Sequence, residues 1–149
     1  MLESLMPSNA QHIERGVEAV LRTGKRKIAM LGLSFKAGTD DLRESPQVQL
    51  IKRLLGEGCQ IKIWDRDVSL ARLAGSNRQY IEEVIPHIGS LLSADMPQVV
   101  DGAEVVIVGT KIDKAELAKL LKPVQTVIDL VNLDPNRRPE AASYEGICW

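Results

Sequence analysis

KIAMLGLSFKAGTDDLRESPQVQLIKRLLGEGCQIKIWD, residues 27–65, is the stretch that decides the fold. It opens with the apolar run 27–33 and closes with the apolar run 60–65, and short runs of this kind, rich in Ile and bounded by Gly or Asp, are typical of buried parallel strands. The segment between them, residues 45–58, predicts a helix. Strand, helix and strand in succession predict one unit of a parallel sheet with a right-handed crossover.

The helix predicted at 45–58 has clear signals at both ends. Ser45 is a suitable N-cap, Pro46 stands at the first helical position, and Gly56 and Gly58 offer a stop. Its apolar residues recur at helical spacing, so one face is expected to pack on the sheet. The polar residues expected to face water are Gln47, Lys52, Arg53 and Glu57.

The rest of the chain repeats this alternation. The further elements expected are strands at 103–109 and 126–131, and helices at 8–22, capped by Ser8 or Asn9, at 68–92, interrupted at 75–77 and at Pro86, and at 113–122. The tail, residues 134–149, has two prolines and no clear period, which predicts irregular structure. The predicted fold class is α/β. It is a three-layer, Rossmann-like sandwich whose mostly parallel sheet carries helices on both faces, preceded by an amino-terminal helix.

Composition excludes several classes of protein. Nineteen Lys and Arg against twenty Asp and Glu give a net charge of −1, so no global basic field favours nucleic acid. No apolar run approaches the roughly 20 residues that a membrane-spanning helix needs, and the start of the chain lacks the layout of a signal peptide. Cys59 and Cys148 form no CxxC pair and are too few for a disulfide framework. We therefore expect a cytoplasmic protein without a membrane or nucleic-acid partner.

The loop after the first strand carries the main chemical signal. Gly32 and Gly38 are separated by five residues, so the loop matches neither GxGxxG nor GxxxxGK[ST]. It does bring Phe35, Lys36 and Arg43 close before a helix start, where the backbone N–H groups and the helix dipole favour an anion. Two cations there suit a phosphate. The alternative is that both cations only pair with the acidic residues of a solvated loop.

The same loop carries a family resemblance. GLSFKAGTDDLRESP, residues 32–46, closely resembles the signature that opens the carboxy-terminal domain of the UDP-glucose/GDP-mannose dehydrogenase family. The segments IWDRDV (63–68), YIEEVIPHIGSLL (80–92) and EGICW (145–149) look like the GDP-mannose branch of that family. The resemblance covers almost the whole chain, and it implies a domain that binds a nucleotide sugar.

The resemblance also implies an activity. Members of this family oxidise the C6 alcohol of the sugar twice with NAD and hold the intermediate as a cysteine thioester. The resemblance implies that the enzyme to which this chain belongs converts GDP-mannose to GDP-mannuronate for polysaccharide synthesis. The GxGxxG motif and the Gly-Gly-Ser-Cys-like segment are absent from these 149 residues, so we expect the isolated chain to be inactive and not to bind NAD tightly. The alternative is a stand-alone nucleotide-binding or assembly module without catalysis.

Domain boundaries and partners follow from the same resemblance. Residues 1–24 are expected to be the end of a helix that links domains, and residues 25–149 the nucleotide-sugar-binding domain. The full-length enzyme is expected to be a homodimer or a higher oligomer.

Three residues receive more specific roles through this resemblance. Lys36 corresponds to a lysine that contacts the nucleotide sugar, and Arg43 to an arginine that reaches the substrate or the phosphates of the cofactor. Phe35 is expected either to line the site or to pack in the core. Residues 129–132 depart from the Asp-Gly-Arg-like turn of the members that bind UDP-sugars, which weakens a UDP assignment.

The cysteines and histidines suggest no second site. Cys59 enters a predicted strand and is expected to be a small buried hydrophobe, and Cys148 is expected to be structural or inert. His12 is expected on a helix surface. His87 follows a proline in the segment shared with the GDP-mannose enzymes, so it could approach substrate, although a loop or core role is favoured. The two histidines have no metal-ligand spacing, and no metal is expected.

Overall fold

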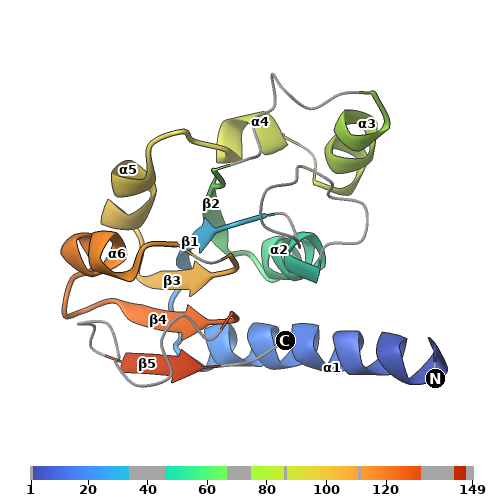
Figure 1. Ribbon diagram of the computed structural model, residues 1–149, viewed down its shortest axis with the longest axis horizontal. Coiled ribbons are helices and arrows are strands. Elements are labelled where there is room, and N and C mark those ends of the chain that lie inside the picture. Colours follow the sequence, from blue (N-terminus) through green and yellow to red (C-terminus); the bar gives the residue numbers. More distant parts are fainter. Residues whose placement is uncertain are drawn as a thin grey trace.

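One parallel sheet forms the centre of the molecule (Figure 1). A computed structural model describes residues 2–33, 46–66, 75–85, 87–110, 112–131 and 143–146. In this part of the chain five strands lie in the order β2-β1-β3-β4-β5, and every neighbouring pair is parallel. Their bounds are β1 Lys27–Leu31, β2 Gln60–Trp64, β3 Val105–Val108, β4 Thr126–Asp129 and β5 Ser143–Gly146.

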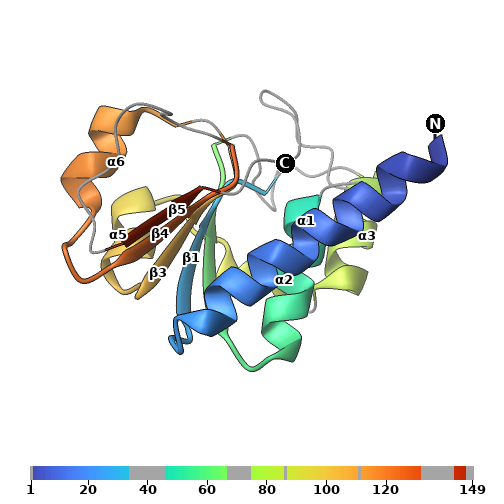
Figure 2. The same cartoon turned by 90° about the horizontal axis from the view of Figure 1, so that it is seen from below.

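Helices cover both faces of the sheet, which confirms the predicted three-layer α/β sandwich. Figure 2 shows α1, α2 and α3 on one face and α5 and α6 on the other. The helices are α1 Leu2–Arg22, α2 Pro46–Gly56, α3 Gly75–Val84, α4 Ile88–Leu91, α5 Met96–Asp101 and α6 Lys114–Leu120. The short α4 lies beside β2, where Leu92 forms a parallel bridge with Ile63.

The core is divided by the sheet into two apolar clusters. In β1, Ile28 and Met30 belong to the cluster with α1 and α2, whereas Ala29 and Leu31 belong to the cluster with α5 and α6. Every residue of β3 and β4 is buried as well. Strands buried on both faces have no polar side to alternate with, and for this reason the sequence shows them as continuous apolar runs.

Helix α1 packs along α2 and belongs to the same core. Gly16 approaches α2 so closely that a Cβ atom would stand 3.2 Å from Leu50 Cδ1. An ion pair of 2.7 Å joins Glu14 Oε2 to Arg53 Nη1 beside this contact. The helix begins at Leu2, so the predicted caps Ser8 and Asn9 lie inside it.

Two further predictions for the local structure are wrong. The tail is not wholly irregular, because its residues 143–146 pair with β4 as the outer strand β5. Residues 75–77 do not interrupt a helix, because they are the first residues of α3. Helix α5 has no counterpart in the prediction, and the boundary expected between residues 24 and 25 stays a prediction.

Candidate functional site

The strand order reverses between β1 and β3 at the carboxyl end of the sheet, which is the position where open parallel sheets form a binding crevice. From β1 the chain moves to β2 on one side, and β3 then pairs with β1 on the other side. The connections that leave β1 and β3 therefore diverge, and open parallel sheets bind their ligands at such a reversal. The residues that follow β1 and β3 are thus the first candidates for a binding site.

Two glycines form the base of this crevice. Gly32 follows β1 with a φ of +107°, and a Cβ atom there would stand only 2.7 Å from the backbone nitrogen of Thr110. Gly109 follows β3, and a Cβ atom there would lie 2.9 Å from the carbonyl oxygen of Gly32. The ends of the two strands therefore meet backbone to backbone.

Gln47 joins helix α2 to this base. Its side chain is only 2% exposed, and Nε2 donates a hydrogen bond of 2.6 Å to the carbonyl oxygen of Gly109. The prediction that Gln47 faces water is therefore wrong. The signal was present in the sequence, because Gln47 precedes the buried Leu50, Ile51 and Leu54 by three, four and seven residues and so shares their helix face.

Asp65 makes a second link, at the end of β2. The carboxylate is 8% exposed, and its Oδ2 accepts a hydrogen bond of 2.6 Å from the backbone N–H of Leu33. The N–H of Gly32 donates to the Trp64 carbonyl oxygen at 2.7 Å, which extends the pairing of β1 and β2 to this point. An acceptor side chain directly after a predicted strand is the signal that points to such a role, but the sequence does not identify the donor.

The predicted site residues Phe35, Lys36 and Arg43 lie outside the described residues. The described chain stops at Leu33 and resumes at Pro46, and both of these flanks belong to the carboxyl edge. Leu33 is held by Asp65, and the residue after Pro46 is held by Gly109. The structure therefore brings together the two ends of the predicted loop.

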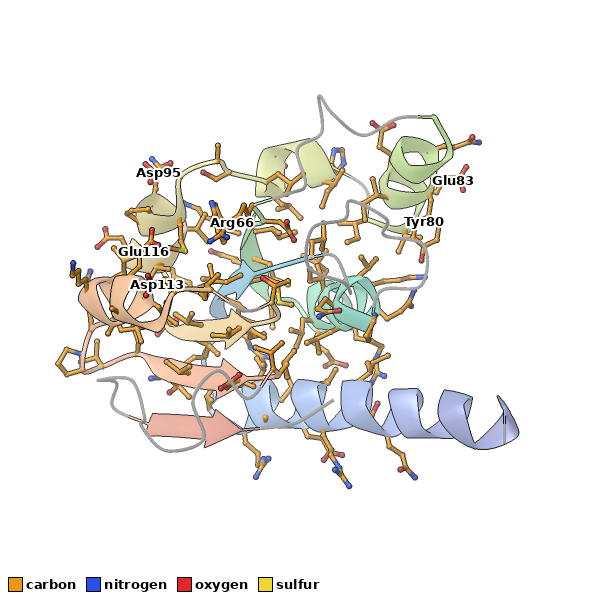
Figure 3. All side chains as sticks on the ribbon, in the orientation of Figure 1. Arg66, Tyr80, Glu83, Asp95, Asp113 and Glu116 are labelled. Atoms are coloured by element: carbon orange, nitrogen blue, oxygen red, sulfur yellow. The ribbon has the colours of Figure 1, made fainter. Side chains whose placement is uncertain are left out.

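The helix starts near this edge differ in charge. Asp113 caps α6 by accepting a hydrogen bond of 2.9 Å from Ala115 N–H, and Glu116 follows in the first turn. Asp95 stands at the N-cap of α5, and Figure 3 shows all three carboxylates on the side of α5 and α6. Helix α2 has no acidic residue in its first turn. Among these described starts α2 is the one that suits an anion, because its positive dipole end is not offset by its own carboxylates.

Asp129 lies at the end of β4, two strands from β1. Its side chain is fully buried, and Oδ1 accepts a hydrogen bond of 2.9 Å from Val131 N–H. The carboxylate thus fixes the turn that leaves β4. It adds a buried acid, rather than a cation, to the carboxyl edge.

A hollow of about 360 Å³ lies at the opposite edge of the sheet. Lys27 and Gln60, the first residues of β1 and β2, line it together with Lys62 and with residues of α4 and α5. It is separated from the crevice by the length of the strands, so the two features are distinct.

A family comparison fits this geometry. The family model described as "UDP-glucose/GDP-mannose dehydrogenase family, UDP binding domain" matches residues 29–134. The chain belongs to the UDP-glucose/GDP-mannose dehydrogenase family. The matched region runs from β1 past β4 and so contains the crevice, its two glycines and both hydrogen-bonded links.

Curated members of the family resemble the chain along its whole length. It is 46% identical over 150 aligned residues to GDP-mannose 6-dehydrogenase of Pseudomonas putida and, likewise, to that of Azotobacter vinelandii. Each alignment covers 100% of the chain and 34% of the relative. The chain therefore spans about a third of the length of these relatives.

Solved structures of the family share the fold. A ternary complex of GDP-mannose dehydrogenase from Pseudomonas aeruginosa superposes with a TM-score of 0.82 at 42% identity, over 100% of the chain and 34% of that protein. A UDP-glucose dehydrogenase from Pyrobaculum islandicum gives a TM-score of 0.70 at 24% identity, over 99% of the chain and 32% of that protein. The second likeness supports the fold alone.

Cys59 and His87 are the cysteine and the histidine whose side chains the structure describes. Cys59 is buried with a free thiol, as predicted for a small hydrophobe, whereas Cys148 and the side chain of His12 lie outside the description. His87 is an exposed loop residue with a φ of 65° at the start of α4. The described residues contain no cluster of three potential metal ligands, and none of the described helices is long and apolar enough to cross a membrane.

Proposed function

We propose that the chain is the nucleotide-sugar-binding domain of an NAD-dependent nucleotide-sugar 6-dehydrogenase that converts GDP-mannose to GDP-mannuronate. The observation that carries this proposal is the 46% identity to GDP-mannose 6-dehydrogenases over the whole chain. The crevice beside α2 adds physical support, because it combines a reversal in strand order with a helix start that suits an anion.

The diphosphate of the nucleotide sugar would bind above this crevice. In the proposal Lys36 supplies the main cation, and Arg43 contacts either the substrate or the phosphates of the cofactor. The anchors on both sides of their segment, at Leu33 and Pro46, support this arrangement because they bring the segment back to the same edge of the sheet. Phe35 would line the site or pack beneath it.

The complete enzyme would take NAD as its oxidant and use a cysteine thiolate as its nucleophile. The described turn after β1 does not fit a dinucleotide. The amide of Gln47 binds the end of β3 beside Gly32, and the chain shows no GxGxxG motif there. We therefore propose that another part of the complete enzyme holds most of NAD, that Arg43 is the candidate contact to its phosphates in this chain, and that this chain alone forms no NADH. We further propose a cytoplasmic enzyme that acts as a homodimer or a higher oligomer.

Removal of the Lys36 charge tests the proposal. A charge-assisted hydrogen bond contributes about 1.5 to 3 kcal/mol, so Lys36→Ala should weaken the affinity of the complete enzyme for GDP-mannose by about ten- to a hundredfold. Lys52→Ala is the matched control. Lys52 is an exposed lysine in the second turn of α2, beyond the helix start at which the anion is proposed to bind. Initial rates of NADH formation give kcat and KM for both variants. Equal values for Lys36→Ala and Lys52→Ala would refute the assigned role.

A further inference from the structure

Two buried polar side chains hold the ends of the predicted anion-binding segment. Asp65 reaches from the end of β2 to the N–H of Leu33, the last described residue before the segment. Gln47, the second residue after segment 34–45, reaches from the start of α2 to the carbonyl oxygen of Gly109. Both hydrogen bonds are 2.6 Å long and buried.

Asp65 occupies a position that other Rossmann-like folds use differently. In dinucleotide-binding domains an acidic residue at the end of the second strand binds a ribose hydroxyl. Here Oδ2 of Asp65 accepts from a backbone N–H, and the carboxylate is 8% exposed. A buried carboxylate that accepts a backbone hydrogen bond fixes the chain at that point. Breaking the bond would leave the N–H and the carboxylate oxygen buried without partners, which costs free energy.

Gln47 is equally committed to the backbone. No side chain fits at Gly109, since a Cβ atom there would stand 3.0 Å from Gln47 Cγ. The Cγ methylene of Gln47 therefore packs against the Gly109 backbone, and its amide donates to the Gly109 carbonyl oxygen. In this way the first turn of α2 is fixed relative to β1 and β3. This placement sets the direction in which the positive end of the helix dipole points.

We propose that Asp65 and Gln47 are positioning residues that fix the two anchors of segment 34–45 and thereby set the affinity for the nucleotide diphosphate. They act through the segment and do not contact the ligand. The assignment rests on the proposed function, because the cations that it positions are Lys36 and Arg43. It predicts that affinity depends on two residues that carry no positive charge.

The variants separate hydrogen bonding from charge and from stability. Asp65→Ala removes the acceptor, whereas Asp65→Asn keeps a side-chain oxygen for Leu33 N–H and removes only the charge. Gln47→Met keeps an unbranched side chain of similar size without the donor. Gln125→Met is the matched control: Gln125 is 1% exposed and its amide donates to the carbonyl oxygens of Val100 and Ala103, away from the crevice.

Hydrogen exchange of the 149-residue chain without ligand is the first measurement. Asp65→Ala and Gln47→Met should speed the exchange of amides 33–45 relative to Gln125→Met, and Asp65→Asn should stay close to wild type. Equal exchange of amides 33–45 in Asp65→Ala and Gln125→Met would overturn the positioning role. This measurement does not depend on ligand binding, so it decides the role of the two anchors even if the proposed function fails.

Titration of the same proteins with GDP-mannose, followed by two-dimensional NMR, is the second measurement. Asp65→Ala should raise the Kd by about tenfold or more and Gln47→Met by about threefold or more, with Gln125→Met unchanged. No binding by the wild-type chain would count against the proposed function and against the link from anchors to affinity. If Asp65→Ala loses affinity for GDP but not for 2′-deoxy-GDP, without faster exchange, Asp65 is a ribose ligand and the proposal is wrong.

Discussion

The close contact at the base of the crevice predicts a large effect for one methyl group. In Gly109→Ala the new Cβ atom would stand 2.8 Å from Met30 Cε, 2.9 Å from the Gly32 carbonyl oxygen and 3.0 Å from Gln47 Cγ. Met30 Cε is the end of a flexible side chain and can move, but the Gly32 oxygen belongs to the backbone and moves only with β1. Overpacking of a buried site costs about 1–3 kcal/mol, and the backbone contact sets our expectation at about 2 kcal/mol.

Thermal and urea unfolding, followed by circular dichroism, measure this loss. For a domain of this size a loss of about 2 kcal/mol lowers Tm by about 4–8 °C. Gly102→Ala is the control, because Gly102 has a φ of −87° and a Cβ atom there meets nothing within 4 Å. That substitution should leave the stability unchanged or raise it slightly, since alanine restricts the unfolded chain. Equal free energies of unfolding for the two variants would show that the strand ends are not in contact as described.

Three further predictions concern the rest of the chain. The hydrogen bond from Arg53 holds the pKa of Glu14 below its ordinary value of 4.5. The small stabilisation from this pair is therefore present above pH 4.5, and it is lost as the pH falls through the lower pKa of the folded state. An NMR titration of the Glu14 carboxyl should show that Arg53→Met restores the ordinary pKa, and an unchanged value would contradict the pairing. Thiol titration after unfolding without reductant should count both Cys59 and Cys148 as free, whereas a monomer with no free thiol would exclude this. In α1, amides near Gly16 should exchange slowly because this part of the helix packs on α2. Amides near the amino end, which extends past α2 in Figures 1 and 2, should exchange faster, and uniform protection along α1 in a dilute monomer would disprove this difference.

The parts of the fold that were predicted correctly have strong local signals. The strands β1, β3 and β4 are apolar because both sides of each are covered, whereas the edge strand β2 alternates buried Ile61 and Ile63 with exposed Gln60 and Lys62. Helix α2 carries a proline at its start and glycines at its end. Asp113, just before α6, was included in the predicted helix and proves to be its cap. Each observed strand is shorter than its apolar run, since the run continues into buried residues, such as Leu33, that follow the strand.

The features that were missed depend on partners distant in the sequence. Strand β5 is four residues long and includes a glycine, and it is defined by the free edge of β4 rather than by its own composition. The hydrogen bonds of Asp65 and Gln47 join residues 32 and 62 positions apart, which no local pattern reports. The roles of Phe35, Lys36 and Arg43 come from resemblance and stay predictions.

The order of the strands has a consequence for how the chain is made and handled. Strands β1, β3 and β4 lie inside the sheet, and β5, one of the two edge strands, is the last of the described strands to leave the ribosome. Until residue 146 has been synthesised, β4 exposes a row of unsatisfied backbone groups, and an exposed edge of this kind is a template for pairing with another chain. Shortening the tail before Ser143 should therefore promote aggregation, and an affinity tag is better attached beyond β5 through a flexible spacer than in place of it.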